Sequence, residues 1–90
     1  MEERYIYLIR LVTDEYTLPH IKAFIDKDLA DEYFENDLKF YRKKDWSVDD
    51  NKNDCGLHVI RRALMVRKDP KTGEYEHMSL LMERLEIIRR

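Results

Sequence analysis

Apolar and polar residues recur along the chain with two different periods, and the longest regular stretch has the period of a helix. Between Asp26 and Lys44 the apolar positions return every three or four residues, which places them in one stripe on a helical surface. Asp26 can cap this helix, because its carboxylate can accept hydrogen bonds from the backbone N–H groups that follow it. The stripe consists of Leu29, Ala30, Tyr33, Phe34, Leu38 and Tyr41, and Phe34 is expected to be its most buried member.

The segments before the helix have the composition of strands. Tyr5–Thr13 is rich in β-branched and aromatic residues and is apolar on both faces except at Arg10, which predicts a central strand or one covered on both sides. His20–Ile25 predicts a short second strand that starts after Pro19, and the short connection allows an antiparallel hairpin. After the helix, the acid- and amide-rich stretch Asp45–Gly56 is expected to be a loop.

The last part of the chain predicts a second hairpin. Leu57–Lys68 and Glu74–Glu83 would be its strands, and Asp69–Gly73 its turn, closed by a left-handed glycine. Pairing Lys68 with Glu74 sets Leu64 opposite Met78, and this register would place six apolar residues on one face. They are Ile60, Leu64, Val66, Met78, Leu80 and Met82.

A helix is the alternative for the end of the chain. Met78, Leu81, Met82, Leu85 and Ile88 have helical spacing. The favourable cross-strand pairs make the hairpin the preferred prediction. The expected fold class is therefore α+β: one ββαββ domain over residues 1–90, with a four-stranded, mostly antiparallel sheet and one helix on one face.

Charge and cysteine content indicate the compartment in which the protein is expected more than they indicate its function. Charged residues make up 40% of the chain, but the formal net charge is only −2, so a general affinity for polyanions is not expected. No apolar run approaches the length of a membrane span, and the start of the chain lacks the apolar core of a signal peptide. One cysteine cannot form an internal disulfide, which fits a reducing compartment and predicts a cytoplasmic protein.

Metal and catalytic motifs are incomplete. Asp49, Asn51 and Asn53 have the first spacings of a calcium loop, but Asp54 and Ile60 occupy the positions that need Gly and Glu. Cys55 and His58 form half of a zinc motif without a second half. A phosphate-binding glycine loop is also missing, so we expect no metal, no cofactor and no enzymatic activity.

Two charged surfaces could have a binding role. The acidic residues of the helix could imitate a phosphate backbone, although such rows are more often solvated surface. They are Asp28, Asp31, Glu32, Glu35 and Asp37. In the predicted register, Arg61 and Arg67 share a sheet face with Tyr75 and His77, a pattern that can bind single-stranded nucleic acid. The simpler interpretation of this second surface is cross-strand packing on a solvated face.

The junction between the second strand and the helix resembles a known kind of protein. Phe24 and Ile25 end the strand, Asp26 caps the helix, and Leu-Ala-Asp-Glu-Tyr follows at 29–33. This arrangement, over about residues 5–41, is similar to that of small uncharacterised bacteriophage accessory proteins with a strand-strand-helix-strand layout. The resemblance implies a viral accessory protein that acts in the host cytoplasm, and inhibition of a host protein is one such role. It implies no catalytic residues.

The function expected from the sequence is a non-enzymatic protein–protein interaction module. A single helix cannot cover both faces of a sheet, and an exposed apolar face commonly marks an interface. The partner would be another protein, or a second copy in a homodimer; the alternative is a small nucleic-acid-binding domain that uses the basic second hairpin. The candidate interaction surface is Tyr5, Tyr7, Arg61, Met65, Arg67, Tyr75, His77 and Leu81.

Overall fold

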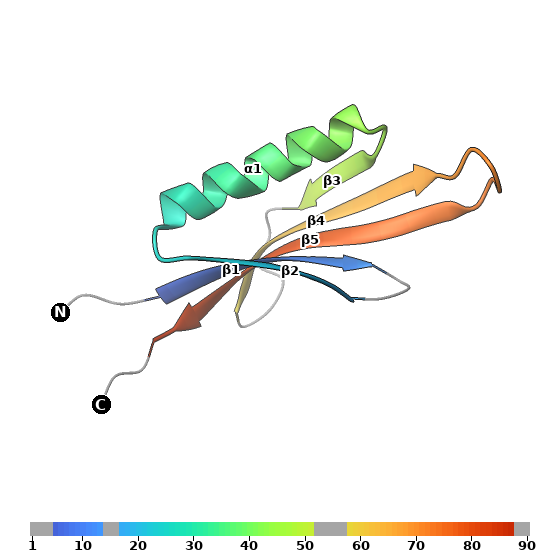
Figure 1. Ribbon diagram of the computed structural model, residues 1–90. Helices are drawn as coiled ribbons and strands as arrows, with labels where there is room; N and C mark the ends of the chain where they lie inside the picture. Colours follow the sequence, from blue (N-terminus) through green and yellow to red (C-terminus); the bar gives the residue numbers. More distant parts are fainter. Residues whose placement is uncertain (1–4, 14–16, 52–57, 88–90) are drawn as a thin grey trace.

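One helix lies across one face of an antiparallel sheet in the computed structural model, which describes residues 5–13, 17–51 and 58–87 (Figure 1). The elements are β1 (Tyr5–Thr13), β2 (Thr17–Phe24), α1 (Lys27–Lys43), β3 (Ser47–Asn51), β4 (Val59–Lys68) and β5 (Tyr75–Glu86). The five strands follow the order β2-β1-β5-β4-β3. The α+β class and the single helix on one face are confirmed, and β1 is an interior strand as predicted. The second strand was predicted to start after Pro19, but β2 begins at Thr17, because an edge strand tolerates proline.

The fifth strand corrects the expected four-stranded sheet. Ser47–Asn51, predicted as the start of a loop, pairs with β4, with Val48 opposite Met65 and Asp50 opposite Ala63. Its acids are poor strand formers, so its composition alone does not indicate a strand. Long-range pairing with β4 supplies what local preference lacks.

The end of α1 prepares this strand. The Trp46 N–H donates to the Tyr41 carbonyl and the Asp45 N–H to the Arg42 carbonyl, which is the Schellman pattern. Asp45 occupies the left-handed position with φ 67°. Aspartate is one of the few residues with a Cβ that tolerate this conformation. The left-handed residue reverses the direction of the chain, so that β3 begins two residues later. At the other end Asp26 caps the helix as predicted, with its carboxylate 2.8 Å from the Asp28 nitrogen.

The second hairpin forms, but its predicted register is wrong by one residue. The Asp69 N–H donates to the Glu74 carbonyl and the Gly73 N–H to the Asp69 carbonyl, so Asp69 pairs with Glu74 around a turn of Pro70–Gly73. Gly73 has φ 75°, the left-handed conformation expected of it. Lys68 therefore lies opposite Tyr75 instead of Glu74.

The shifted register exchanges the faces of one strand relative to the other. Met65 lies opposite Met78, and Leu64 lies opposite Ser79. Leu64 and Val66 were predicted to share a face with Met78, Leu80 and Met82, but they lie on the opposite face of the sheet. The alternative helix for residues 78–88 is excluded for the described part, because β5 continues as a strand to Glu86.

The core lies between α1 and the sheet face that it covers. Ala30, Phe34 and Leu38 of the helix are completely buried, which confirms the central position of Phe34. Leu29, expected in the same stripe, is 55% exposed because it lies at the edge of the stripe. The sheet contributes Ile9, Leu11, Ala63, Met65, Leu80 and Met82 to this core.

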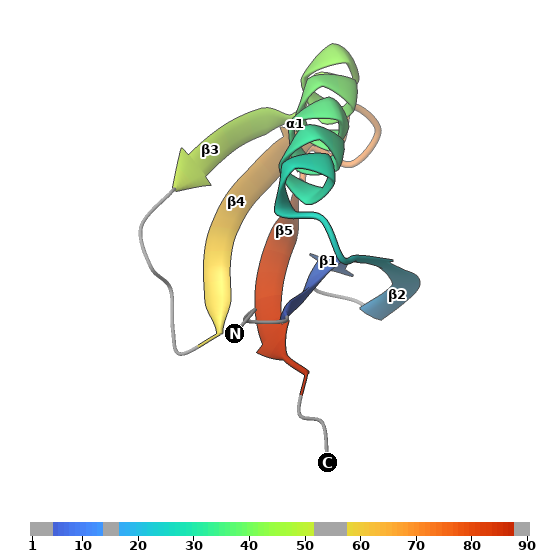
Figure 2. The same ribbon diagram turned by 90° about the vertical axis from the view of Figure 1, so that its left-hand side faces the viewer.

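The arrangement leaves the opposite face of the sheet, here called the open face, without a covering element among the described residues (Figure 2). The protein is elongated, with principal extents of 54 × 22 × 22 Å. None of the described helical residues forms a segment long and apolar enough to span a membrane.

Candidate functional site

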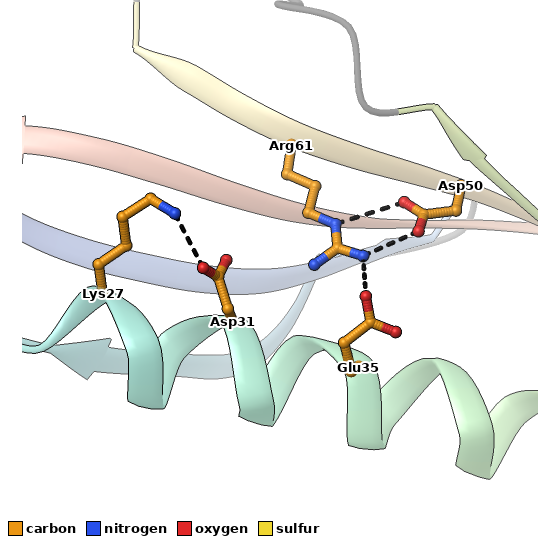
Figure 3. A network of polar contacts seen from close by, with 5 residues as sticks. All are labelled: Lys27, Asp31, Glu35, Asp50 and Arg61. Carbon is orange, nitrogen blue, oxygen red and sulfur yellow. Dashed lines mark hydrogen bonds and ion pairs between the residues drawn. The ribbon is translucent and has the colours of Figure 1, made fainter.

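Arg61 organises a polar network on the side of α1 that faces β3 and β4 (Figure 3). Its guanidinium donates to both oxygens of Asp50 on β3, with Nε–Oδ1 and Nη2–Oδ2 distances of 3.4 and 2.8 Å. The same Nη2 also binds Glu35 on the helix. One side chain of β4 therefore joins three elements.

Burial makes this network structural. The Arg61 side chain is only 11% exposed, and its guanidinium lies 4.3 Å from the centroid of the Phe34 ring. Burial alone would lower the pKa of Arg61, but the hydrogen bonds to Asp50 and Glu35 outweigh it and raise the pKa above its ordinary value. The cation is already neutralised by two carboxylates and is a poor binding site for an external phosphate.

The other flank of α1 borders a pocket of about 300 Å³ between the helix and the β1–β2 hairpin. Tyr33, Asp37 and Tyr41 line it at intervals of four residues, so they lie above one another on the helix. The other lining residues are Ile9, Leu11, Lys22, Phe40 and Leu80. The acidic residues of the helix therefore do not form one row: Asp31 and Glu35 pair with Lys27 and Arg61 on one flank, and Asp37 lies on the other.

Asp37 has a less favourable environment than the other half-buried carboxylates. Within the described residues it makes no hydrogen bond or ion pair, whereas Asp31, Glu35 and Asp50 each bind a cation. Burial raises the pKa of Asp37 above its ordinary value, and burial together with the charge of Asp37 raises the pKa of Tyr33 and Tyr41.

Replacing Asp37 with asparagine should therefore stabilise the protein at neutral pH. Because its pKa is higher in the folded chain than the ordinary 3.8, the folded state favours the protonated carboxyl, and stability falls as pH rises through the folded pKa. The gain from Asp37→Asn in urea unfolding should be present at pH 7 and should shrink as pH falls toward about 4. Asp31→Asn, which removes a paired carboxylate, is the control and should give no such gain. A loss of stability in Asp37→Asn at pH 7 would contradict this account.

The open face carries apolar side chains from most of its strands. Cross-strand pairs place Ile21, Arg10, Leu81 and Arg62 in one row across four strands. Ile21 is 54% exposed and Leu64, in the neighbouring row, is 39% exposed. Further apolar residues on this face are Ile6, Leu8, Val12, Val66, Tyr75 and Leu85.

A buried carboxylate lies among these apolar side chains. Glu83 is only 7% exposed, and its Oε1 lies 2.5 Å from Arg10 Nη2, in an ion pair without hydrogen-bond geometry. His58 Nε2 is 3.4 Å from the other oxygen of Glu83. No ion pair is formed by Arg62 within the described chain, and its Nε is buried without a hydrogen-bond partner. The centre of the open face thus combines apolar surface with a neutralised charge pair and one arginine that has no ion pair among the described residues.

The structure divides the predicted interaction surface between the two faces. Tyr75, His77 and Leu81 lie on the open face, as expected. Met65 is instead a core residue with 1% exposure, and Arg61 and Arg67 lie on the helix-covered side with it. Tyr7 packs against the core, and Tyr5 lies on the same side under the guanidinium of Arg84.

The one-residue shift in register explains this division. In the predicted pairing Arg67 would share a face with Tyr75, but Arg67 actually lies opposite Glu76. It donates to Glu76 through Nε and Nη2 at 3.0 and 2.8 Å, and it stacks 4.7 Å from the Trp46 ring. The predicted interleaving of basic and aromatic residues on one open face is therefore wrong. Ile21, Leu64 and Arg62 of the open face were missed because only the correct register brings them together.

The metal motifs of the sequence lie largely outside the residues that the structure describes. Among the described residues, no three His, Cys, Asp or Glu side chains form a group that could hold a metal ion. Asp50, next to the first residue of the calcium-like spacing, is engaged by Arg61. Asn53, Asp54 and Cys55 lie outside the described residues.

Comparisons of the chain with models of known protein families, with curated proteins and with solved structures gave no match. The geometry of the open face and of the two flanks of α1 is therefore the basis for any functional proposal.

Proposed function

We propose that this protein is a non-enzymatic protein-binding module and that the open face of its sheet is the binding surface. The observation that carries the proposal is the row Ile21, Arg10, Leu81 and Arg62, in which apolar and arginine side chains alternate on a face that no described element covers. Binding hot spots are enriched in arginine and aromatic side chains surrounded by apolar contacts. A partner with an apolar surface and a carboxylate opposite Arg62 would complement this row.

The ion pairs favour a protein partner over nucleic acid. Arg10, Arg61 and Arg67 each already bind a carboxylate of the same chain. A phosphate backbone would have to compete with these internal pairs, and the acids of β3 would repel it. The nucleic-acid alternative therefore depends on few cations, such as Arg62 and Lys68.

The sheet edges favour face-to-face contact over strand addition. Pro19 removes one backbone donor from the edge strand β2, and the other edge strand, β3, is short and carries Asp49 and Asp50. Proline and charge are devices that prevent pairing of edge strands. A homodimer, if it forms, would thus use the open face, although two copies would bring their Arg62 residues toward each other.

The viral part of the proposal rests on the resemblance of the strand-to-helix junction at Phe24–Tyr33 to bacteriophage accessory proteins. In that form of the proposal the partner is a host protein that the module binds or inhibits. The cytoplasm of the host would then be the place of action.

The test is affinity capture from nuclease-treated bacterial lysate with matched surface variants. Ile21→Ser combined with Leu64→Ser changes two exposed apolar residues of the open face. Leu29→Ser is the control, because Leu29 is 55% exposed and lies on α1, on the other side of the sheet. The proposal predicts a protein that the wild type and the control retain, and that the open-face variant loses by about tenfold or more.

The remaining outcomes are distinguishable. Equal capture by both variants would show that the open face is not the binding surface. Capture that occurs only from lysate without nuclease treatment, together with binding of oligonucleotides that weakens steeply with salt, would favour the nucleic-acid alternative. Light scattering of the purified protein completes the test: a dimer that only the open-face variant dissociates would make a second copy the partner and overturn a host target.

A further inference from the structure

The pocket beside Asp37 has a chemical character that the protein-binding proposal does not use. Its floor is apolar, formed by Ile9, Leu11 and Leu80 of the interior strands. Aromatic side chains of α1 border it, and Asp37 is the carboxylate among them. At about 300 Å³ it has the size of a small ligand site.

We propose that this pocket binds an organic cation in which a guanidinium or ammonium head is joined to a short apolar stem. The head would pair with Asp37, which has no ion pair or hydrogen bond within the described residues. Tyr33, Phe40 and Tyr41 line the pocket, and aromatic rings attract positive charge through their quadrupole. The apolar floor would receive the stem.

The aromatic neighbours are held in place by contacts of their own, which makes the pocket preformed. Tyr33 packs against Phe24, with ring centroids 5.3 Å apart. Tyr41 meets Phe40 and Trp46 edge-on, at 5.2 and 6.3 Å. A site whose rings are already fixed loses little conformational freedom on binding.

The contrast with the opposite flank of α1 supports this assignment. On that flank, Glu35 lies four residues before Lys39 but forms its ion pair with Arg61. The Arg61 guanidinium lies over the Phe34 ring. The Asp37 flank has the same combination of carboxylate and aromatic ring, but no cation from the described part of the chain pairs with Asp37. Lys22 lines the pocket, yet it forms no ion pair with Asp37 in the described structure.

The experiment is an NMR titration of the ¹⁵N-labelled full chain with three probes. N-propylguanidinium represents a free organic cation, acetyl-arginine methylamide represents a protein side chain, and N-propylurea is the neutral analogue. We expect amide shifts around Tyr33, Asp37 and Phe40, with the urea binding about tenfold or more weakly than propylguanidinium. Tighter binding of the arginine probe would identify a protein side chain as the source, and equal or tighter binding of propylguanidinium would identify a free cation.

Variants complete the test. Asp37→Asn should weaken propylguanidinium about tenfold, whereas Asp31→Asn, on the other flank, should leave its affinity unchanged. Lys22→Gln should leave it unchanged or improve it slightly. The proposal is overturned if no probe shifts these amides, if urea and guanidinium bind equally, or if Asp37→Asn binds as the wild type does. It is also overturned if binding appears only in Lys22→Gln, because Lys22 would then be the cation of the pocket.

Discussion

Replacing Phe34 with alanine should lower the free energy of unfolding by about 3–5 kcal/mol, the range for removing a large aromatic side chain from a core. Phe34 is completely buried at the centre of α1, between the helix and the strands β1, β4 and β5. Its ring also supports the guanidinium of Arg61, so the substitution removes a cation–π contact together with the apolar packing. For a domain whose total stability is about 5–15 kcal/mol, this loss is a large share of the total.

Leu29→Ala is the matched control for this prediction. Leu29 belongs to the same apolar stripe in the sequence, but it is 55% exposed, and its truncation should change stability by no more than about 0.5 kcal/mol. Denaturant unfolding of both variants, monitored by circular dichroism, measures the difference. A cost below about 1 kcal/mol for Phe34→Ala would show that α1 uses a different face against the sheet.

The elements that sequence predicted correctly are those whose signals are local. Helix α1 combines a capping aspartate, an apolar period and an ordered charge distribution, all within residues 26–44. Strand β1 has the bounds Tyr5–Thr13 that its composition indicates. The turn before β5 was found from Pro70 and Gly73, because a left-handed position selects glycine.

The elements that sequence missed depend on contacts between distant segments. Strand β3 contains only one apolar residue, Val48, and it forms because β4 provides its hydrogen-bonding partner and Arg61 binds Asp50. The register of β4 and β5 depends on whether the turn closes at Lys68 or at Asp69, a choice that composition does not determine. The irregularity in β4 between Val59 and Arg61 adds a second shift in register, which no pattern of residues in the sequence predicts.

The candidate sites show the same limit. Met65 and Arg67 were expected on the uncovered face of the sheet, but they lie on the helix-covered side. A shift of one residue in register moves every side chain of a strand to the other face. Asp37 was grouped with the other acids of α1 as solvated surface, since its spacing from Tyr33 and Tyr41 has meaning only when β1 and β2 close the pocket. Local charge and aromatic content can indicate which residue types could form these sites, whereas strand pairing determines which of those residues come into contact.

Replacing Arg61 with methionine should lower the free energy of unfolding by about 3 kcal/mol, the size of effect seen when one partner of a buried ion pair is removed. Methionine keeps much of the apolar stem over Phe34, so the loss should come mainly from charge. Asp50, whose side chain is 16% exposed, would lose its cation and face the carboxylate of Glu35. Since Arg61 joins β3 to α1, amide hydrogen exchange in Val48 and Asp50 should accelerate more than in β1.

A triple variant separates the charge effect from packing. Arg61→Met combined with Asp50→Asn and Glu35→Gln leaves no unpaired carboxylate in the network, so it should recover at least half of the stability that Arg61→Met loses. Arg67→Met is the matched single control, because its pair with Glu76 is more exposed, at 37% and 42%, and should contribute only about 0–1 kcal/mol. If the triple variant were as unstable as Arg61→Met alone, the guanidinium would stabilise the fold through its contact with the Phe34 ring, and the two carboxylates would have little energetic role.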